Sequence, residues 1–192
     1  APFLAWISPN APHTPLQVPD EYLQKTAHLS PPSRQKNMAM MLALDDAVGR
    51  VMKAVRESGK EEQTLVLFVS DNGAALIKGS SENGGSNAPL RGSKTQCWEG
   101  GIRVPFMAQW KSRWPAGRVI EDPICTLDLL PTLLAAANLT LPESQKLDGL
   151  NLLPWLDGKA EKPKREQLCF KMSGTNFAIR DGASIFGPYD FD

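Results

Sequence analysis

The chain has 192 residues, and its hydrophobic content of 42% and charged content of 22% are ordinary for a globular domain or a piece of a larger one. Its 21 basic and 21 acidic residues give a formal net charge of zero, which indicates neither a nucleic-acid partner nor an acidic disordered tail. No apolar run reaches the roughly 18 residues that a membrane-spanning helix needs, so we expect no membrane partner.

The first half of the chain has the alternating strands and helices of an α/β protein. Residues 2–8 form a short apolar run, which predicts a buried strand, and the proline-rich residues 9–19 predict a loop after it. Apolar residues recur at helical steps over residues 33–58, which predicts an amphipathic helix capped by Gly59. The apolar run at residues 64–69 predicts a strand of a parallel sheet, so we expect a strand–helix–strand crossover.

A long loop dominates the middle of the chain. Residues 71–101 are rich in Gly, Ser and Asn, and a loop of this length inside a compact domain is usually functional. After it, we expect a strand at residues 104–110 and a helix at residues 129–137, with Asp128 as the helix cap.

The spacing of proline and glycine divides the chain into three parts. Residues 1–140 form the α/β part, residues 141–165 a linker, and residues 166–192 the start of a small antiparallel subdomain. In this last part, residues 167–173 and 176–180 predict the two strands of a hairpin. The chain opens on a strand-like run without a basic leader, so we expect no signal peptide and a start within a domain.

The most informative polar residues follow the strand predicted at residues 64–69. Asp71 and Asn72 come directly after it, and ligands of open α/β sheets bind outside the carboxyl ends of strands. A carboxylate beside a carboxamide oxygen suits a hard cation such as calcium or magnesium, and Gly73 lets the backbone turn away. The alternative is an ordinary strand-ending turn, because Asp-Asn-Gly is common turn chemistry.

Two further residues are expected at the same edge of the sheet. His13 follows the strand predicted at residues 2–8, and Lys94 lies among small residues at the end of the long loop. Small neighbouring residues let both the lysine ammonium group and the backbone of the loop approach an oxyanion closely. Taken singly, such residues are more often an ordinary loop histidine and a solvated surface lysine. Their delivery to one edge by parallel strands favours a common site.

Six motifs then occur in a recognisable order. They are NAPHTPLQ (10–17), LDDAVGRV (44–51), LVLFVSDNG (65–73), PLRGSK (89–94), WEGGIRVPF (98–106) and TLDLLPTLL (126–134), with a weaker echo in NFAIRDG (176–182). Together they resemble the type I sulfatases, the arylsulfatase family of the alkaline-phosphatase superfamily. The resemblance implies the later part of an alkaline-phosphatase-like, mostly parallel sheet flanked by helices, followed by the antiparallel subdomain.

The resemblance also implies a site and a substrate class. A divalent metal, usually calcium and alternatively magnesium, would be bound by Asp71 and Asn72, while His13 and Lys94 would contact the sulfate ester. The substrate would be an aryl sulfate or a sulfated carbohydrate, and family members are expected in the periplasm, in lysosomes or outside the cell. Expelling an alkoxide or phenoxide from sulfate calls for cations and a proton donor, which fits these roles.

The sequence departs from the family in its nucleophile. Sulfatases use a formylglycine made from the first residue of a Cys/Ser-x-Pro-Ser-Arg motif, and two aspartates on their first strand complete the metal site. Neither that strand nor those aspartates occur in this chain, so we expect it to be inactive alone and its missing N-terminal half to be a possible partner. Residues 30–34 (SPPSR) do fit the motif and make Ser30 a weak candidate nucleophile. Their place after the histidine motif favours coincidence at a helix start, with Ser33 as N-cap.

Several alternatives stay open on the sequence alone. The function could be that of a phosphodiesterase or phosphonate hydrolase of the same superfamily, or the chain could be a non-catalytic fragment.

Asn138 heads a glycosylation sequon but also suits a helix C-terminus, which we favour. Asp45 and Asp46 lie in the middle of the predicted helix, and we expect an ion pair or a cap there and no catalytic role. The three cysteines, widely spaced and odd in number, argue against a disulfide framework and a zinc site.

Overall fold

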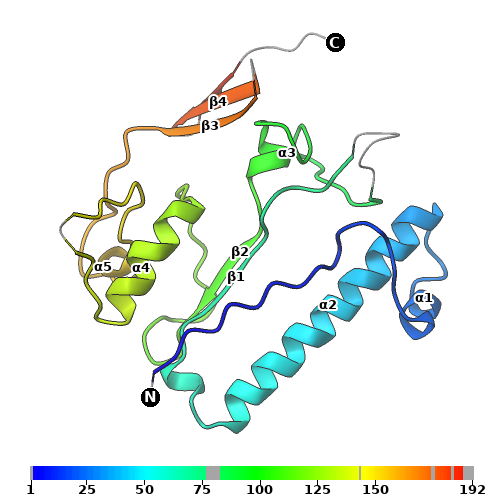
Figure 1. The fold of residues 1–192 in the computed structure, drawn as a ribbon, viewed down its shortest axis with the longest axis horizontal. Coiled ribbons are helices and arrows are strands. Elements are labelled where there is room, and N and C mark those ends of the chain that lie inside the picture. The colour runs from blue at the N-terminus through cyan, green and yellow to red at the C-terminus, as the bar shows by residue number, and fades with distance from the viewer. Residues whose placement is uncertain (1, 77–82, 143, 174–175, 183, 188–192) are drawn as a thin grey trace. The chain divides into compact units, whose positions relative to one another are not determined.

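The fold is described by a computed structural model, which covers residues 2–76, 83–142, 144–173, 176–182 and 184–187 (Figure 1). Its elements, in chain order, are α1 (Asp20–Lys25), α2 (Pro32–Glu57), η1 (Glu61–Gln63), β1 (Val66–Val69), α3 (Glu99–Ile102), β2 (Phe106–Gln109), η2 (Thr126–Asp128), α4 (Leu129–Ala136), α5 (Leu153–Leu156), β3 (Leu168–Ser173), β4 (Asn176–Asp181) and β5 (Ser184–Phe186). Helices and sheet are mixed, as the sequence predicts.

The chain divides into two compact units. Unit 1 consists of Ala1–Glu61 and Phe68–Met107, and unit 2 consists of Glu62–Leu67 and Ala108–Asp192. Buried apolar side chains occur in both, namely Ala39, Met40, Ala75 and Cys97 in unit 1, and Leu152, Leu153, Leu168 and Ala178 in unit 2. The domain boundaries expected near residues 140 and 165 stay predictions.

The strand predicted at residues 2–8 does not form. These residues have no regular secondary structure, and their large apolar side chains face solvent, with Phe3 85% and Trp6 80% exposed. A strand needs a neighbour to take its backbone hydrogen bonds. Because this first strand is absent from the structure, the predicted strand–helix–strand crossover is absent with it.

Helix α2 is the main element of unit 1, and α1 packs beside it (Figure 1). The predicted helix is confirmed with small shifts at its ends, since Pro31 is the N-cap and Gly59 follows Ser58 with a φ of 67°. Ser33 is therefore inside the helix, and its predicted role as N-cap is wrong. Proline suits the start of a helix because its fixed φ is helical and the first N–H groups need no partner there.

Helix α1 was not expected, and Thr26 at its C-terminus joins it to α2. The buried Thr26 hydroxyl is within 3.2 Å of the Leu23 and Gln35 carbonyl oxygens, and Gln35 Nε2 donates to the Leu23 carbonyl at 3.2 Å. A second link uses Asp46, whose carboxylate accepts a hydrogen bond from the Tyr22 hydroxyl at 2.8 Å. This bond to Asp46 raises the pKa of Tyr22 and gives Asp46 a structural contact, whereas the ion pair or cap expected there stays a prediction.

Strands β1 and β2 pair in a two-stranded sheet. Both lie inside the strands predicted at residues 64–69 and 104–110. The Ser70 amide extends the contact beyond the strands by donating to the Pro105 carbonyl at 3.1 Å. Ser70, directly after β1, is therefore held against the segment that connects the short helix α3 to β2; α3 was not predicted.

Asp128 organises the start of α4 in unit 2. Its side chain is 1% exposed, and its carboxylate accepts backbone N–H groups from Cys125 at 3.0 Å and Leu150 at 2.8 Å and pairs with the Arg165 guanidinium. Asp128 is the N-cap residue of α4, as predicted, but its side chain makes no hydrogen bond to that helix and caps the preceding turn η2. The same carboxylate thus holds three backbone segments together.

At the other end of α4, Asn138 has a φ of 54° directly after the C-cap Ala137. Asparagine tolerates this left-handed conformation better than most residues, so the predicted role at the helix end is confirmed.

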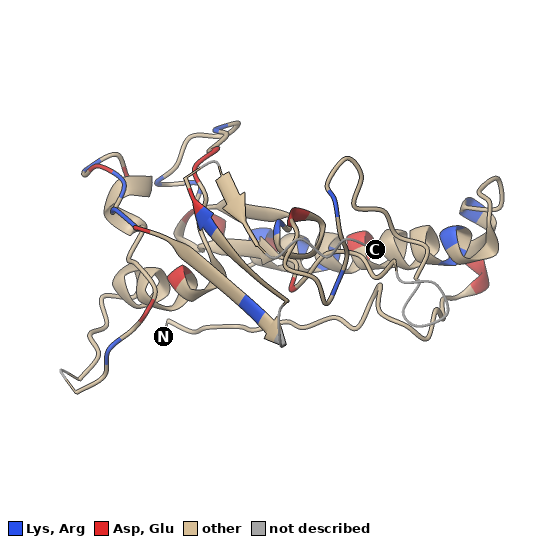
Figure 2. Ribbon diagram, turned by 90° about the horizontal axis from the view of Figure 1, so that it is seen from above, with Lys and Arg blue, Asp and Glu red and all other residues tan. Residues whose placement is uncertain are grey.

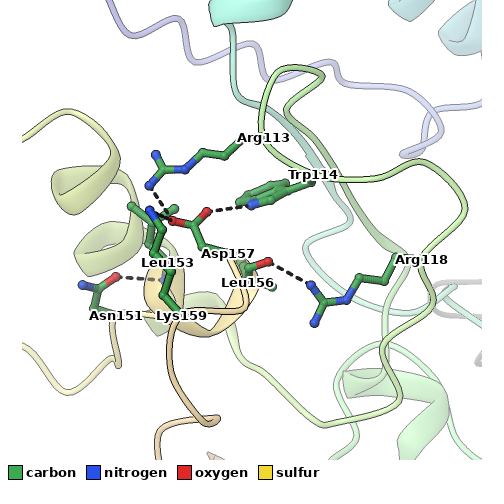
Figure 3. A network of polar contacts seen from close by, with 8 residues as sticks. All are labelled: Arg113, Trp114, Arg118, Asn151, Leu153, Leu156, Asp157 and Lys159. Atoms are coloured by element: carbon green, nitrogen blue, oxygen red, sulfur yellow. Dashed lines mark hydrogen bonds and ion pairs between the residues drawn. The ribbon is translucent and has the colours of Figure 1, made fainter.

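The predicted linker contains ordered structure, because α5 lies within it. Asp157, just after α5, has a side chain that is 3% exposed and is surrounded by donors (Figure 3). Arg113 Nη2 lies 2.5 Å from its Oδ2, and Trp114 Nε1 donates to its Oδ1 at 3.1 Å. Burial raises the pKa of Asp157, but the hydrogen bonds from Arg113 and Trp114 outweigh this and leave the pKa below its usual value.

The predicted hairpin is confirmed as the first two strands of a three-stranded antiparallel sheet in the order β3-β4-β5. Leu168 pairs with Arg180 and Lys171 with Phe177, whereas the turn expected at Gly174 lies outside the described residues. Strand β5 was not predicted. Basic positions (blue) and acidic positions (red) are both scattered along the ribbon of the chain (Figure 2). Within the described residues, no helix is long and apolar enough to cross a bilayer.

Candidate active site

The structure brings His13 and Lys94 into contact. Lys94 Nζ lies 3.2 Å from His13 Nε2, although the two residues are 81 positions apart in the chain. His13 Nδ1 lies 2.6 Å from the Thr14 carbonyl oxygen, which can only accept, so Nδ1 carries a proton in this arrangement. In the neutral ring, Nε2 is then free to accept a hydrogen bond from the Lys94 ammonium group. His13 is exposed and Lys94 half-buried, so the pair can be reached from solvent.

Asp71 and Asn72 form a tight turn directly after β1. The Asn72 amide donates to Asp71 Oδ1 at 2.9 Å, and the Asn72 carboxamide nitrogen donates to the Gly73 carbonyl at 2.9 Å. The Ser70 hydroxyl donates to the Asn72 carbonyl at 3.0 Å. These bonds use one oxygen of Asp71 and only the nitrogen of the Asn72 side chain. Within the described residues, the second carboxylate oxygen and the carboxamide oxygen accept no hydrogen bond that competes with a ligand.

Close backbone packing ties this turn to α3. The Gly73 amide donates to the Gly101 carbonyl at 3.0 Å, and a Cβ on Gly73 would lie 1.7 Å from the Gly100 carbonyl oxygen. Real Cβ atoms do not approach backbone so closely, so glycine is required at position 73. The turn that carries Asp71 and Asn72 is therefore fixed against the glycines of the WEGG motif.

The same turn is tied to the loop that carries Lys94. The Lys94 amide donates to the Ala74 carbonyl at 3.1 Å. The Asn87 carboxamide accepts from the Ala74 amide at 2.7 Å and donates to the carbonyl groups of Ala74 and Gly92, each at 3.0 Å. Sequence reasoning missed Asn87, because one asparagine in a loop rich in Gly, Ser and Asn carries no pattern of its own. The only signal was the glycine pair at 84–85, which indicates close backbone contact.

The donor set at this turn fits a hard cation only in part. Asp71 and Asn72 supply oxygens of the kind that calcium and magnesium prefer, but calcium takes about 6–8 oxygen ligands. In the part of the chain that the structure describes, no three His, Cys, Asp or Glu side chains group as a metal site. Asp71 and Asn72 are thus suited to form one side of a metal site that further ligands complete.

The segment that contains Ser30 lies at the start of α2, and Ser30 is exposed. Arg34 Nη1 donates to the Gly84 carbonyl at 3.2 Å, and a Cβ on Gly84 would lie 2.3 Å from the Ser33 carbonyl oxygen. The segment therefore packs on the loop before Asn87. Its hydrogen bonds describe a helix start and give no support to Ser30 as a nucleophile.

Comparison with known proteins places these motifs in a family. A sulfatase family model matches residues 1–139. The chain is 32% identical over 190 residues to the uncharacterized sulfatase YdeN of Escherichia coli (strain K12), which covers 98% of the chain and 33% of that protein. It is also 36% identical over 155 residues to human N-acetylgalactosamine-6-sulfatase, covering 81% of the chain and 28% of the relative.

Solved structures agree with this grouping. The crystal structure of Ps i-CgsB in complex with k-i-k-neocarrahexaose matches with a TM-score of 0.81 and 34% identity, over 90% of this chain and 38% of that one. The PsFucS1 sulfatase from Pseudoalteromonas sp. matches with a TM-score of 0.66 and 29% identity, over 76% of this chain and 29% of that one. The predicted alkaline-phosphatase-like α/β fold is thereby confirmed.

The chain spans about a third of the length of the curated relatives that it matches. Its family model covers most of its residues, and its relatives and structural neighbours agree. The chain belongs to the sulfatase family, and it corresponds to a C-terminal portion of a sulfatase.

Proposed function

We propose that this chain forms the cation-bearing side of a sulfatase active centre and acts in the hydrolysis of a sulfate ester. The observation that carries the proposal is the 3.2 Å contact between Lys94 Nζ and His13 Nε2. Two motifs far apart in the sequence meet there, beside a turn of the kind that binds hard cations. The arrangement is suited to an anionic group that must lose a negatively charged oxygen.

The chemistry follows from the hydrogen-bonding capacity of the two side chains. An ammonium group has three N–H donors, so Lys94 can contact His13 and still donate to sulfate oxygens. As the bond from sulfur to the leaving oxygen breaks, negative charge grows on that oxygen. A proton held at Lys94 Nζ or passed to His13 Nε2 is placed to neutralise it, which is general acid catalysis.

Asp71 and Asn72 would hold a divalent metal, with calcium favoured and magnesium as the alternative. Bound there, the ion would supply positive charge to the sulfate oxygens. We expect calcium to bind the isolated chain weakly, because Asp71 is the one charged ligand of the proposed pair and Asn72 adds a single neutral oxygen. Calorimetry checks this expectation, and tight binding of one calcium per chain would contradict it.

The substrate class that we favour is a sulfated carbohydrate. Two similar proteins support this choice by their descriptions, N-acetylgalactosamine-6-sulfatase and Ps i-CgsB in complex with k-i-k-neocarrahexaose. An aryl sulfate is the alternative. Comparing turnover of a sulfated oligosaccharide and an aryl sulfate by a complete enzyme that contains this chain would separate the two.

We also propose that the 192-residue chain does not turn over sulfate esters by itself. Covalent catalysis needs an activated nucleophile held in line with the leaving group, and the family's nucleophile motif has no counterpart before the histidine motif. A chromogenic aryl sulfate assay on the purified chain should show no turnover. Turnover that disappears in Ser30→Ala would overturn this proposal and make Ser30 the nucleophile.

Sulfate binding tests the site independently of turnover. The chain has two histidines, so ¹³C labelling of the imidazole rings gives two sets of NMR signals, which a His28→Gln variant assigns. Inorganic sulfate should shift the His13 signals, and Lys94→Met should weaken sulfate binding about 10-fold or more, because a charged hydrogen bond contributes roughly 1.5–3 kcal/mol. Lys53→Met, on the exposed surface of α2, is the control and should change nothing. Equal responses in Lys94→Met and the unaltered chain would refute the proposed site.

A further inference from the structure

Asn87 occupies a special place between the two halves of the candidate site. Its carboxamide oxygen accepts the Ala74 amide, and its nitrogen donates to the carbonyl groups of Ala74 and Gly92. Ala74 follows the Asp71–Gly73 turn, and Gly92 lies two residues before Lys94. The Asn87 side chain therefore connects the Asp71–Gly73 turn to the loop that carries Lys94.

Contacts of the preceding residues 83–85 hold Asn87 in this position. The Asn83 amide donates to the Ala75 carbonyl at 3.0 Å, and a Cβ on Gly85 would lie 2.7 Å from the Ala74 Cβ. Further back, Gly84 accepts a hydrogen bond from Arg34 of α2. The loop is thus anchored at Asn83 and Gly84 and packed closely at Gly85 before it reaches Asn87, which limits the positions open to the carboxamide.

Only an asparagine side chain satisfies all three groups at this distance. Its carboxamide offers one acceptor oxygen and two N–H donors, whereas an aspartate offers acceptors alone. The Ala74 carbonyl also accepts from the Lys94 amide, so Asn87 and the backbone of Lys94 share one anchor. A shift of the carboxamide would move Gly92, and with it the start of the segment that places Lys94.

We infer that Asn87 is a positioning residue of the active site, which sets the place of Lys94 relative to His13 and to the Asp71–Gly73 turn. This inference rests on the proposed function, because it assigns Asn87 to the same anion site. Asn87 acts through Lys94 and does not itself contact the sulfate group. Its substitution should uncouple Lys94 from His13 without unfolding the chain.

The experiment uses the full 192-residue chain and the same ring signals of His13. In the unaltered chain, Lys94→Met should move the His13 signals, because the two side chains are in contact. In an Asn87→Asp background, adding Lys94→Met should move them little or not at all. Inorganic sulfate should bind Asn87→Asp and Asn87→Ala at least about fivefold more weakly than the unaltered chain, because the half-buried hydrogen bonds that place Lys94 are lost.

Two further variants complete the design. Ser86→Ala is the matched control, because it alters the neighbouring exposed residue and, among the described residues, removes a 3.3 Å bond from the Ala88 amide. It should keep both the sulfate affinity and the coupling. The aspartate in Asn87→Asp has the same shape as asparagine and keeps an acceptor for the Ala74 amide. If circular dichroism shows that Asn87→Ala is unfolded, Asn87→Asp alone tests whether Asn87 positions Lys94.

The outcomes separate this inference from the proposed function. Unchanged coupling and sulfate affinity in the Asn87 variants, with both lost in Lys94→Met, would overturn the role of Asn87 and leave the site intact. No effect of Lys94→Met on the His13 signals or on sulfate binding would overturn the site, and the role of Asn87 with it. Loss of coupling in the Asn87 variants but not in Ser86→Ala is the expected result.

Discussion

Replacing Asp128 with alanine should destabilise unit 2 by an amount that the structure allows us to work out. The carboxylate is buried and has three partners, namely the Cys125 amide, the Leu150 amide and the Arg165 guanidinium. Asp128→Ala leaves a partly buried arginine without its anion, which typically costs about 3–5 kcal/mol. The two orphaned amides add to this cost if water does not reach them. We therefore expect a loss of about 4 kcal/mol in the free energy of unfolding.

Urea unfolding measures this loss. Tryptophan fluorescence is a suitable signal because Trp110, Trp114 and Trp155 belong to unit 2. With a slope of about 2 kcal/mol per molar urea, the midpoint should fall by about 2 M. Asp148→Ala, at an exposed position in the same part of the chain, is the control and should change the stability by less than about 0.5 kcal/mol. Equal midpoints for Asp128→Ala and Asp148→Ala would refute the reasoning.

Two further predictions concern acid stability and glycine. Because the pKa of Asp157 is lowered in the fold, its ionised form stabilises the protein above pH about 4, and this contribution is lost as the pH falls through the lower folded value. Asp157→Asn should therefore unfold at lower urea concentration than the unaltered chain at pH 7, and the difference should shrink toward pH 3; a difference independent of pH would contradict this. Gly73→Ala should disturb the site, since its Cβ would overlap the Gly100 carbonyl oxygen, and it should abolish the sulfate response of the ring signals. Gly49→Ala in α2 has open space and should instead raise the stability by about 0.5–1 kcal/mol, as thermal unfolding can show; a loss of stability there would refute the contrast.

The elements that sequence reasoning found are those fixed by local pattern. Helix α2 has a long apolar period, and β1 is a continuous apolar run, so both were located within a few residues. Helix α1 was missed although Pro19 and the acidic residues after it are ordinary helix-start signals. The apolar pattern of residues 2–8 was right for a strand, but a strand also needs a partner, which no local pattern specifies.

The residues of the candidate site were also chosen from local motifs, and their common role stays a prediction. His13, Asp71, Asn72 and Lys94 were named from motifs, and the contact between Lys94 and His13 depends on how two distant loops meet. Asn87 could not be found in this way, because its role arises from hydrogen bonds to backbone groups 5 and 13 residues away. Asp128 was expected at a helix start, but its ion pair with Arg165 joins segments 37 residues apart.

The exposed apolar segment at residues 2–8 has a consequence for the behaviour of the chain in solution. Extended backbone with open hydrogen-bonding groups and large apolar side chains is a template for pairing with another copy. Proteins usually guard such edges with charge or proline, and between Phe3 and Ile7 this segment has neither. We expect the chain to self-associate as its concentration rises, and Trp6→Lys to suppress this association in light scattering. Colloidal stability, more than folding, would then limit how concentrated a sample of this chain can be made.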